Sequence, residues 1–447
     1  MQPEESLVFF YAKQVPLVED TGRRVLVGAG RVLKIGPLTE YDYSGKVDGN
    51  IRSLIWERMV NHSIRPDFHD GFLLPYHEAL AKCEDGLKFD PVEVIAFAPE
   101  DRFTEFSYAT EHVSNDGAIS ALLSCRVALL RASDLFNVAT TRQEQWIDRQ
   151  LGRLWKKRGA FPGLGAVLTA TGAPMGNFVA QTLSERVGEE GNVWAAWYAA
   201  VEAPSKHLPP ELSRHIDVTT AKAWQRMAAE RRHFLELMSR VDLSVVQAGI
   251  LAVPEQRQAF GIGASDSDFL QNPYLLYEAT RLTATPVGLA AVDRGMFPPN
   301  FVRQNFPLAA PSEVNSSVDA RRLRALAIRH LEGAAATGDT LRPVTDVIMA
   351  LRRTKDIDQE LQTNVTSDLL KVAEEENFAG EIIVAKMADE ESAYQLIRLA
   401  SVGQVIRTTV AKRVEQGQRL QINVDWCAGN RRDLEARLRG QTRGLKL

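Results

Sequence analysis

The sequence has few of the features that would place a protein outside the cell or in a membrane. Its 447 residues include only three cysteines, Cys83, Cys125 and Cys427, which lie too far apart for a CxxC metal knuckle or a disulfide framework. We expect them to be small buried side chains in a reducing compartment. The opening residues, MQPEESLVFF, are acidic where a secretory signal is basic, and no apolar run approaches the ~20 residues of a membrane helix. These absences predict a cytoplasmic protein with no membrane partner.

A large excess of either charge is also absent. Lysine and arginine total 53 against 57 aspartate and glutamate residues, which gives a net charge of −4. This balance excludes a uniformly basic protein that coats nucleic acid, although it allows a local basic patch. The hydrophobic fraction of 45 % and the charged fraction of 25 % are typical of folded domains. At roughly 100–200 residues per domain, the length predicts about two to four of them.

The sequence signatures of nucleotide and hydrolase sites are missing. The chain contains no GxxxxGK[ST], HExxH or GxSxG motif. The glycine pairs at 28–30, 163–165 and 261–263 lack the third glycine and the acidic partner of a dinucleotide site. We therefore expect no catalytic residue for ATP hydrolysis and no cofactor in this chain. ATP and Mg²⁺ would be needed only by a motor domain attached to it.

One cluster of imidazole and carboxylate side chains supports a different hypothesis. It comprises His62, Asp67, His69, Asp70, His77 and Glu78. Such groups could hold a metal ion, and a metal-dependent nuclease would use Asp67, His69, Asp70 or Glu78. The spacing matches no zinc motif, so we assign no metal ligand, and the alternative is a polar loop beside the core of the first domain.

Hydrophobic periodicity gives the first part of the chain a mixed character. Residues 7–12, 24–35 and 92–98 have the composition of strands, the second being one long strand or two strands joined at its glycines. Residues 116–132 have apolar side chains at the three- and four-residue spacing of a helix. These patterns predict an α+β domain over residues 1–138, to which no function is assigned.

The rest of the chain is predicted to be mainly helical. Helices expected at 143–155, 193–201 and 221–241, separated by short turns, indicate a helical domain over 139–312. Helices at 318–336, 341–353 and 363–376 are followed by strands at 380–386 and 394–399 and by a helix at 402–416. Three helices before a two-stranded ribbon are the order of a winged helix, so we expect a winged-helix-like domain over 313–416. Residues 431–447 hold six basic and two acidic residues, which indicates a basic linker over 417–447.

The segment WKKRGAFPGLGAVLTA has the pattern of a helix–hairpin–helix. The preceding helix carries Arg153, Lys156, Lys157 and Arg158, and the hairpin is Gly163, Leu164 and Gly165. Glycines let a backbone approach closely, and hairpin amides at the positive end of the next helix can face a phosphate. The leucine would anchor the hairpin in the core. Such a unit would bind the DNA backbone without recognising sequence. The alternative is a plain helical corner that needs glycine for its conformation.

A second hairpin of this kind occurs about a hundred residues later, at Gly261, Ile262 and Gly263, and is followed by Asn272, Pro273 and Tyr274. Further motifs follow in order: a small residue and Asp293, then Arg322 to Ala325, then GDTLRP at 338–343. In this order and spacing, residues 150–415 resemble the helical module that precedes the motor of RecD-like superfamily-1 DNA helicases. Two departures are Val167, where the family usually has a cation, and the sequence TPVG at 285–288, where it has a second Gly-x-Gly.

This resemblance implies the DNA-engaging, regulatory front part of an ATP-dependent helicase, with single-stranded or forked DNA as its partner. The motor could follow in a longer chain, belong to a partner subunit or have been lost. A second hypothesis is an interaction scaffold that docks an ATPase or nuclease, and the nuclease described above is a third.

The missing phosphate-binding loop leads to a direct prediction. The purified chain should show no saturable ATP turnover, with or without DNA, in a coupled phosphate-release assay. Turnover that follows Michaelis–Menten kinetics and survives repurification would contradict it.

Overall fold

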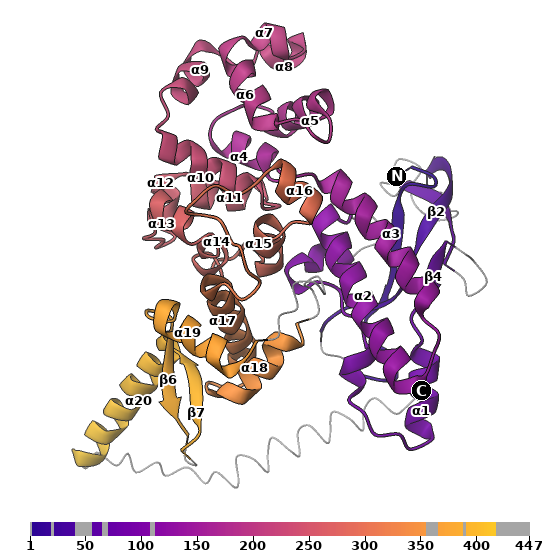
Figure 1. The fold of residues 1–447 in the computed structure, drawn as a ribbon, viewed down its shortest axis with the longest axis vertical. Coiled ribbons are helices and arrows are strands. Elements are labelled where there is room, and N and C mark those ends of the chain that lie inside the picture. The colour runs from indigo at the N-terminus through magenta and orange to yellow at the C-terminus, as the bar shows by residue number, and fades with distance from the viewer. Residues whose placement is uncertain are drawn as a thin grey trace, which may run out of the picture.

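The computed structural model describes residues 2–18, 22–40, 56–64, 70–107, 112–354, 365–387 and 390–416. In these residues the chain is mainly helical, with one antiparallel sheet near each end of the sequence (Figure 1). A mainly α, multi-part fold is therefore confirmed. None of the described helices is both long enough and apolar enough to cross a bilayer. The expected basic linker and Cys427 lie outside the described residues.

The N-terminal sheet is built around one long strand. Strand β2 (Val25–Glu40) pairs in antiparallel fashion with β1 (Leu7–Ala12), β3 (Trp56–His62) and β4 (Gly71–Leu73). The single-strand interpretation of its GAG run is therefore correct. A Cβ on Gly28 would overlap the carbonyl oxygen of Phe72, so glycine is needed here for the close approach of β4.

The strand expected at 92–98 is wrong. Residues Pro91–Val94 form the short 3-10 helix η1, because the Asp90 carboxylate accepts from the N–H of Val92 and Pro91 fits the first turn. Of this segment, only Phe97 forms a β-bridge, to Val25. A second 3-10 segment, η2 (Glu100–Phe106), follows.

Three helices pack with this sheet: α1 (Tyr76–Glu84), α2 (Asn115–Phe136) and α3 (Thr141–Arg158). Figure 1 shows α2 and α3 side by side next to the sheet. Buried side chains from β2, α2 and α3, such as Leu26, Ile119 and Trp155, belong to one core. The expected boundary between residues 138 and 139 thus falls between two helices that share this core.

A succession of shorter helices follows. They are α4 (Leu164–Ala170), α5 (Gly176–Val187), α6 (Val193–Glu202), α7 (Pro204–His207), α8 (Pro210–Ser213), α9 (Val218–Gln225), α10 (Ala229–Ser239), α11 (Val245–Ala252), α12 (Pro254–Ala259), α13 (Asp266–Gln271), α14 (Leu275–Glu278), α15 (Leu289–Met296) and α16 (Asn300–Asn305). The single helix expected at 221–241 is wrong: the backbone is extended at Ala228, which separates α9 from α10. The break lets Trp224 pack on Trp197 while Phe234 stacks on Phe269.

The C-terminal part has the order helix, strand, helix, helix, hairpin, helix. Its elements are α17 (Ala320–Ala336), β5 (Arg342–Pro343), α18 (Val344–Arg352), α19 (Ser367–Asn377), β6 (Ile382–Lys386), β7 (Ser392–Leu396) and α20 (Ile397–Glu415). The sheet has the strand order β5-β7-β6. The helix expected at 341–353 begins at Val344, with Pro343 as its N-cap, and β5 was not predicted. One core runs from Leu164 in α4 to Leu396 in β7, so the parts expected at 139–312 and 313–416 are packed together.

A buried carboxylate joins the first three helices to the rest of the chain. Asp116, in the first turn of α2, accepts from Arg158 Nε at 2.5 Å and from Arg294 Nε of α15 at 2.9 Å. Arg158 also donates to the carbonyl of Arg240 after α10, and Arg294 donates to the hydroxyl of Ser120. Each of these groups leaves water, and each finds a charged or polar partner, as a buried ion network requires.

The network predicts a large loss of stability when its carboxylate is removed. Asp116→Asn should lower the free energy of unfolding by about 3–5 kcal/mol, because two buried guanidinium groups lose their counter-charge. Urea unfolding followed by circular dichroism measures this. The control is Asp148→Asn, which breaks the exposed pair with Arg126 and should cost less than about 1 kcal/mol. Equal losses in the two variants would contradict the assignment.

The network also predicts a pH dependence. Burial alone would raise the pKa of Asp116, but its attraction to Arg158 and Arg294 lowers that pKa below the ordinary value. A lowered carboxyl pKa stabilises the fold fully above about pH 4 and progressively less as the pH falls. The stability difference between the native chain and Asp116→Asn should therefore shrink below about pH 4. A difference that grows on acidification would show that the carboxyl is protonated in the folded state.

Candidate nucleic-acid interface

The first glycine hairpin is closed by packing against α10. Gly163 immediately precedes α4, and its N–H donates to the carbonyl of Ser239 at 2.9 Å. A Cβ on Gly163 would overlap the carbonyl oxygen of Val241. Glycine is present here because α4 approaches the end of α10 backbone to backbone.

The other glycine of this hairpin serves a second close contact. A Cβ on Gly165 would overlap the side-chain oxygen of Asn177 in α5. Leu164 between the glycines is buried in the core, where the sequence placed it. All three hairpin residues are buried, so no phosphate can reach their backbone in this structure. The interpretation of Gly163 and Gly165 as phosphate ligands is replaced by one in which they allow helix packing.

The basic end of α3 has an exposed side. Arg153, Lys156 and Lys157 are exposed. Lys156 lies 3.8 Å from Glu189 and Lys157 lies 3.7 Å from Glu5, both as surface ion pairs. Such pairs contribute little energy and exchange readily, so these cations are still accessible to an anion.

Arg158 lies on the opposite side of α3 and points inward. Its side chain is 1 % exposed and bonds to Asp116 and to the carbonyl of Arg240. The prediction that Arg158 neutralises a phosphate is therefore corrected: its charge stabilises the junction of α2, α3 and α15. From sequence alone this arginine could not be distinguished from the neighbouring lysines.

The second hairpin is open to solvent. Ile262 is buried, and its N–H donates to the carbonyl of Arg257 at 2.8 Å. Gly261 and Gly263 are exposed, and a Cβ on either would have no heavy atom within 4 Å. Gly261 has a φ of +69°, which favours glycine. In the described part of the chain, no acceptor pairs with the N–H of Gly263 or of Ala264. Two adjacent unpaired amides are a backbone feature that binds anions.

Two arginines lie close to this hairpin in the sequence or in the fold. Arg257 and Arg231 both bond to Asp266 in the first turn of α13, which gives the three side chains one net positive charge. The adjacent Asp268 accepts from Ser265 and caps the same helix. The N-terminus of α13 therefore already has two carboxylates beside it. The hydrogen-bond donors left without a protein acceptor are the amides of the hairpin.

A shallow groove and an aromatic side chain adjoin the open glycines. The groove, of about 390 Å³, is lined by Pro254, Arg257, Gln258, Gly261, Ile262 and Gly263. Phe260, at the end of α12, is 48 % exposed. An exposed ring beside free amides is a combination that can stack a base while the backbone holds a phosphate.

Three of the other motifs behind the helicase resemblance meet inside the molecule, whereas residues 338–341 of GDTLRP are exposed. The Tyr274 hydroxyl donates to Asp293 Oδ1 at 2.8 Å, and Arg322 donates to both oxygens of Asp293 at 2.7 and 2.8 Å. All three side chains are at most 4 % exposed. Residues up to 48 positions apart therefore form one buried contact between α14, α15 and α17. This triad of Tyr274, Asp293 and Arg322 stabilises the architecture and does not contact a ligand.

In the histidine and carboxylate cluster near residue 70, Asp70 is bonded to other side chains of the protein. Asp70 accepts from Arg31 Nε at 2.6 Å and from Trp146 Nε1 at 2.9 Å. Asp67 and His69 lie outside the described residues. Among the residues that are described, no group of three or more candidate ligands comes together.

The remaining members of that cluster point to separate places. The His62 ring packs edge-on against Phe10, with centroids 4.6 Å apart. His77 and Glu78 lie on the exposed side of α1. The described residues of the cluster thus have structural contacts and favour the polar-loop interpretation.

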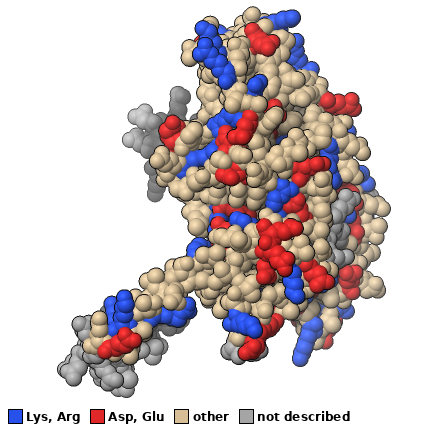
Figure 2. All heavy atoms as spheres, turned by 60° about the vertical axis from the view of Figure 1, so that its left-hand side comes forward, with Lys and Arg blue, Asp and Glu red and all other residues tan. Residues whose placement is uncertain are grey.

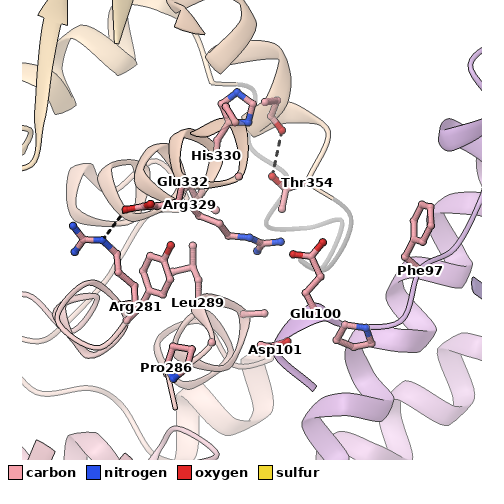
Figure 3. Close-up of a pocket in the computed structure, with 18 of the residues that line it drawn as sticks. Phe97, Glu100, Asp101, Arg281, Pro286, Leu289, Arg329, His330, Glu332 and Thr354 are labelled. Atoms are coloured by element: carbon pink, nitrogen blue, oxygen red, sulfur yellow. Dashed lines mark hydrogen bonds and ion pairs between the residues drawn. The ribbon is translucent and has the colours of Figure 1, made fainter. Parts of the chain in front are cut away.

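A cleft that the sequence did not reveal lies between the N-terminal part and the C-terminal helices. It encloses about 720 Å³ and takes most of its lining from three distant segments, near 97–101, 277–290 and 326–354. Figure 3 shows Arg281, Arg329 and Glu100 around it. Its charges are neutralised within its walls, with Arg281 3.3 Å from Glu332 and Arg342 2.9 Å from Asp339. Burial, together with the positive charge of Arg342, lowers the pKa of His330.

The face drawn in Figure 2 gives no single-sign patch. Lysine and arginine side chains are interspersed there with aspartate and glutamate. The described residues on this face therefore form no broad basic surface.

Comparison with protein-family models, with curated proteins and with solved structures finds no match for this chain.

The contrast between the two hairpins predicts that the same substitution lowers the thermal stability at one hairpin and leaves it unchanged at the other. Gly163→Ala should lower the thermal midpoint by several degrees, because the new methyl group has no room beside the Val241 carbonyl. Gly263→Ala should leave it unchanged within about 1 °C, since the site is open and lacks a positive φ. Differential scanning calorimetry distinguishes the two. A tolerated Gly163→Ala would mean that the first hairpin is not closed.

Proposed function

We propose that this chain is a non-catalytic accessory region of a RecD-like DNA helicase that binds the DNA backbone without recognising sequence. In this proposal the contact is made by the second hairpin, Gly261, Ile262 and Gly263. The exposed cations of α3, Arg153, Lys156 and Lys157, supply further electrostatic attraction. ATP and Mg²⁺ belong to a motor that this chain assists, in the same polypeptide or in a partner subunit.

The observation that carries the proposal is the pair of unpaired amides at Gly263 and Ala264. Neither N–H is used by another group of the described chain, Gly263 is exposed, and two such amides in succession suit a phosphate oxygen. Because a backbone donor meets every phosphate alike, such a contact does not depend on base sequence.

The topology of the C-terminal part supports the same proposal. The element order α17, β5, α18, α19, β6, β7 with strand order β5-β7-β6 is that of a winged helix. The helicase module resembled by this sequence has such a domain after its hairpins. The buried triad of Tyr274, Asp293 and Arg322 links the hairpin region to this domain, and all three residues belong to motifs of the resemblance.

The winged-helix-like domain itself is not the proposed DNA contact. Its third helix, α19, carries Asp368, Glu374, Glu375 and Glu376 against a single cation, Lys371. This helix would repel a phosphate backbone, so we place the contact at the hairpin.

A second candidate function is an interaction scaffold that docks an ATPase or nuclease partner. It is favoured by one observation, the closure of the first hairpin: Gly163 and Gly165 are buried in helix packing. A module in which neither hairpin binds DNA would act only by binding partner proteins with its surface.

The test is a charge placed on the open hairpin. Gly263→Glu should weaken binding to a fluorescent single-stranded or forked oligonucleotide at least tenfold at low salt, because the new carboxylate faces the phosphate. Fluorescence anisotropy measures this. Gly333→Glu, which adds the same charge at an exposed, open position of α17, is the matched control and should leave the affinity within twofold.

The salt dependence supplies a second criterion. The slope of log affinity against log salt should be negative for the native chain, since phosphate contacts release counter-ions. No measurable DNA binding by the native chain at low salt would remove the DNA proposal and leave the scaffold. Equal loss in both glutamate variants would place the contact elsewhere.

A further inference from the structure

The last described helix has an exposed apolar face. In α20 no residue is buried, and five β-branched side chains are 54–74 % exposed. They are Val402, Val405, Ile406, Val410 and Val414. Figure 1 shows α20 extending away from the other helices, to the left of β6 and β7. We call these five side chains the α20 stripe.

The spacing of the stripe is regular. Val402, Ile406, Val410 and Val414 follow one another at i, i+4 intervals, so they lie on one face of the helix over ~18 Å. A row of this kind facing water is unfavourable and marks a contact surface in soluble proteins.

The charges around the stripe restrict what can cover it. Arg407, Lys412 and Arg413 are exposed on α20, and Glu415 is the one carboxylate of this helix. Two α20 helices packed on each other would bring like charges together. The surface that covers the stripe should therefore be acidic and partly apolar.

The chain carries such a surface on α19. The exposed face of this helix presents Asp368, Val372, Glu375 and Glu376 at i, i+4, i+7 and i+8, with Val372 49 % exposed. Lys371 is its one cation. In the same chain α19 packs on α17, whereas α20 leads away from β7, so one copy does not bring the two surfaces together.

We propose that two copies of this chain associate about a twofold axis, with α20 of each copy packed on α19 of the other. In a twofold dimer the contact between α20 and α19 is formed twice, once in each direction, because both copies contribute the same two helices. A specific interface buries at least roughly 1,200 Å², and the twofold pairing contributes two helix contacts toward that area instead of one. The stripe covers Val372, and the cations of α20 face the carboxylates of α19.

The first test is the oligomeric state of the full chain. Sedimentation velocity should show a monomer–dimer equilibrium between about 1 and 100 µM, shifted toward monomer by added salt. Ile406→Asp should give a monomer throughout this range, because a carboxylate then lies in the middle of the stripe. The control is Val246→Asp on α11, where a side chain 58 % exposed is changed in the same way and the dimer should persist.

The second test is an exchange of charges. Arg407→Glu combined with Arg413→Glu makes α20 acidic, and Glu375→Lys combined with Glu376→Lys makes α19 basic. Each double variant alone should be monomeric, because like charges then face each other. An equimolar mixture of the two should restore the dimer, since each acidic helix meets a basic one.

Either of two results would overturn the proposal. One is a native chain that stays monomeric at 100 µM, which would mean that a different molecule covers the stripe. The other is a dimer that survives Ile406→Asp or fails to reform in the mixture. Neither result bears on DNA binding, because Gly263 belongs to another part of the fold and is tested by oligonucleotide affinity.

Discussion

The buried ion network of Asp116 is the interaction on which the arrangement of this protein depends. One carboxylate at the start of α2 binds the last residue of α3 and a residue of α15, and so connects the N-terminal sheet to the helices that carry the hairpins. Charged groups can leave water only when they are paired, so this junction tolerates few alternative packings. The position of the second hairpin relative to the N-terminal part follows from it.

A similar buried contact explains why the sequence motifs are spaced as they are. Tyr274, Asp293 and Arg322 form the triad between α14, α15 and α17, and this determines the distance from the second hairpin to the winged-helix-like domain. Motifs that suggested a DNA-binding module therefore include residues that are buried inside the protein. They preserve the framework, and the exposed loop beside them is the part available for binding.

Much of the fold could be predicted from the sequence because its elements have strong local signals. The strand at 7–12, the helix of 320–336 and the hairpin of β6 and β7 follow from periodicity and turn residues. The turn at 91–94 has local signals in Asp90 and Pro91, but the apolar run 92–98 outweighed them in the prediction. The break at Ala228 could not be predicted, because the tertiary packing of α9 and α10 overrides the helical pattern there. For the site, Leu164 was placed correctly in the core, whereas the burial of Ile262 was not predicted. Which glycine pair stays open depends on whether another helix covers it. Arg158 points inward because it pairs with Asp116, and this could not be predicted because the two residues are 42 positions apart in the sequence.

The account assigns different roles to two hairpins of the same sequence type: one for packing and one for binding. Hydrogen exchange measured by mass spectrometry, with and without a single-stranded oligonucleotide, tests this difference most directly. The account predicts slower exchange on DNA binding in peptides that cover Gly263 and Ala264, with no change around Gly163. Unchanged exchange at residues 260–264 under conditions where DNA is bound would contradict it.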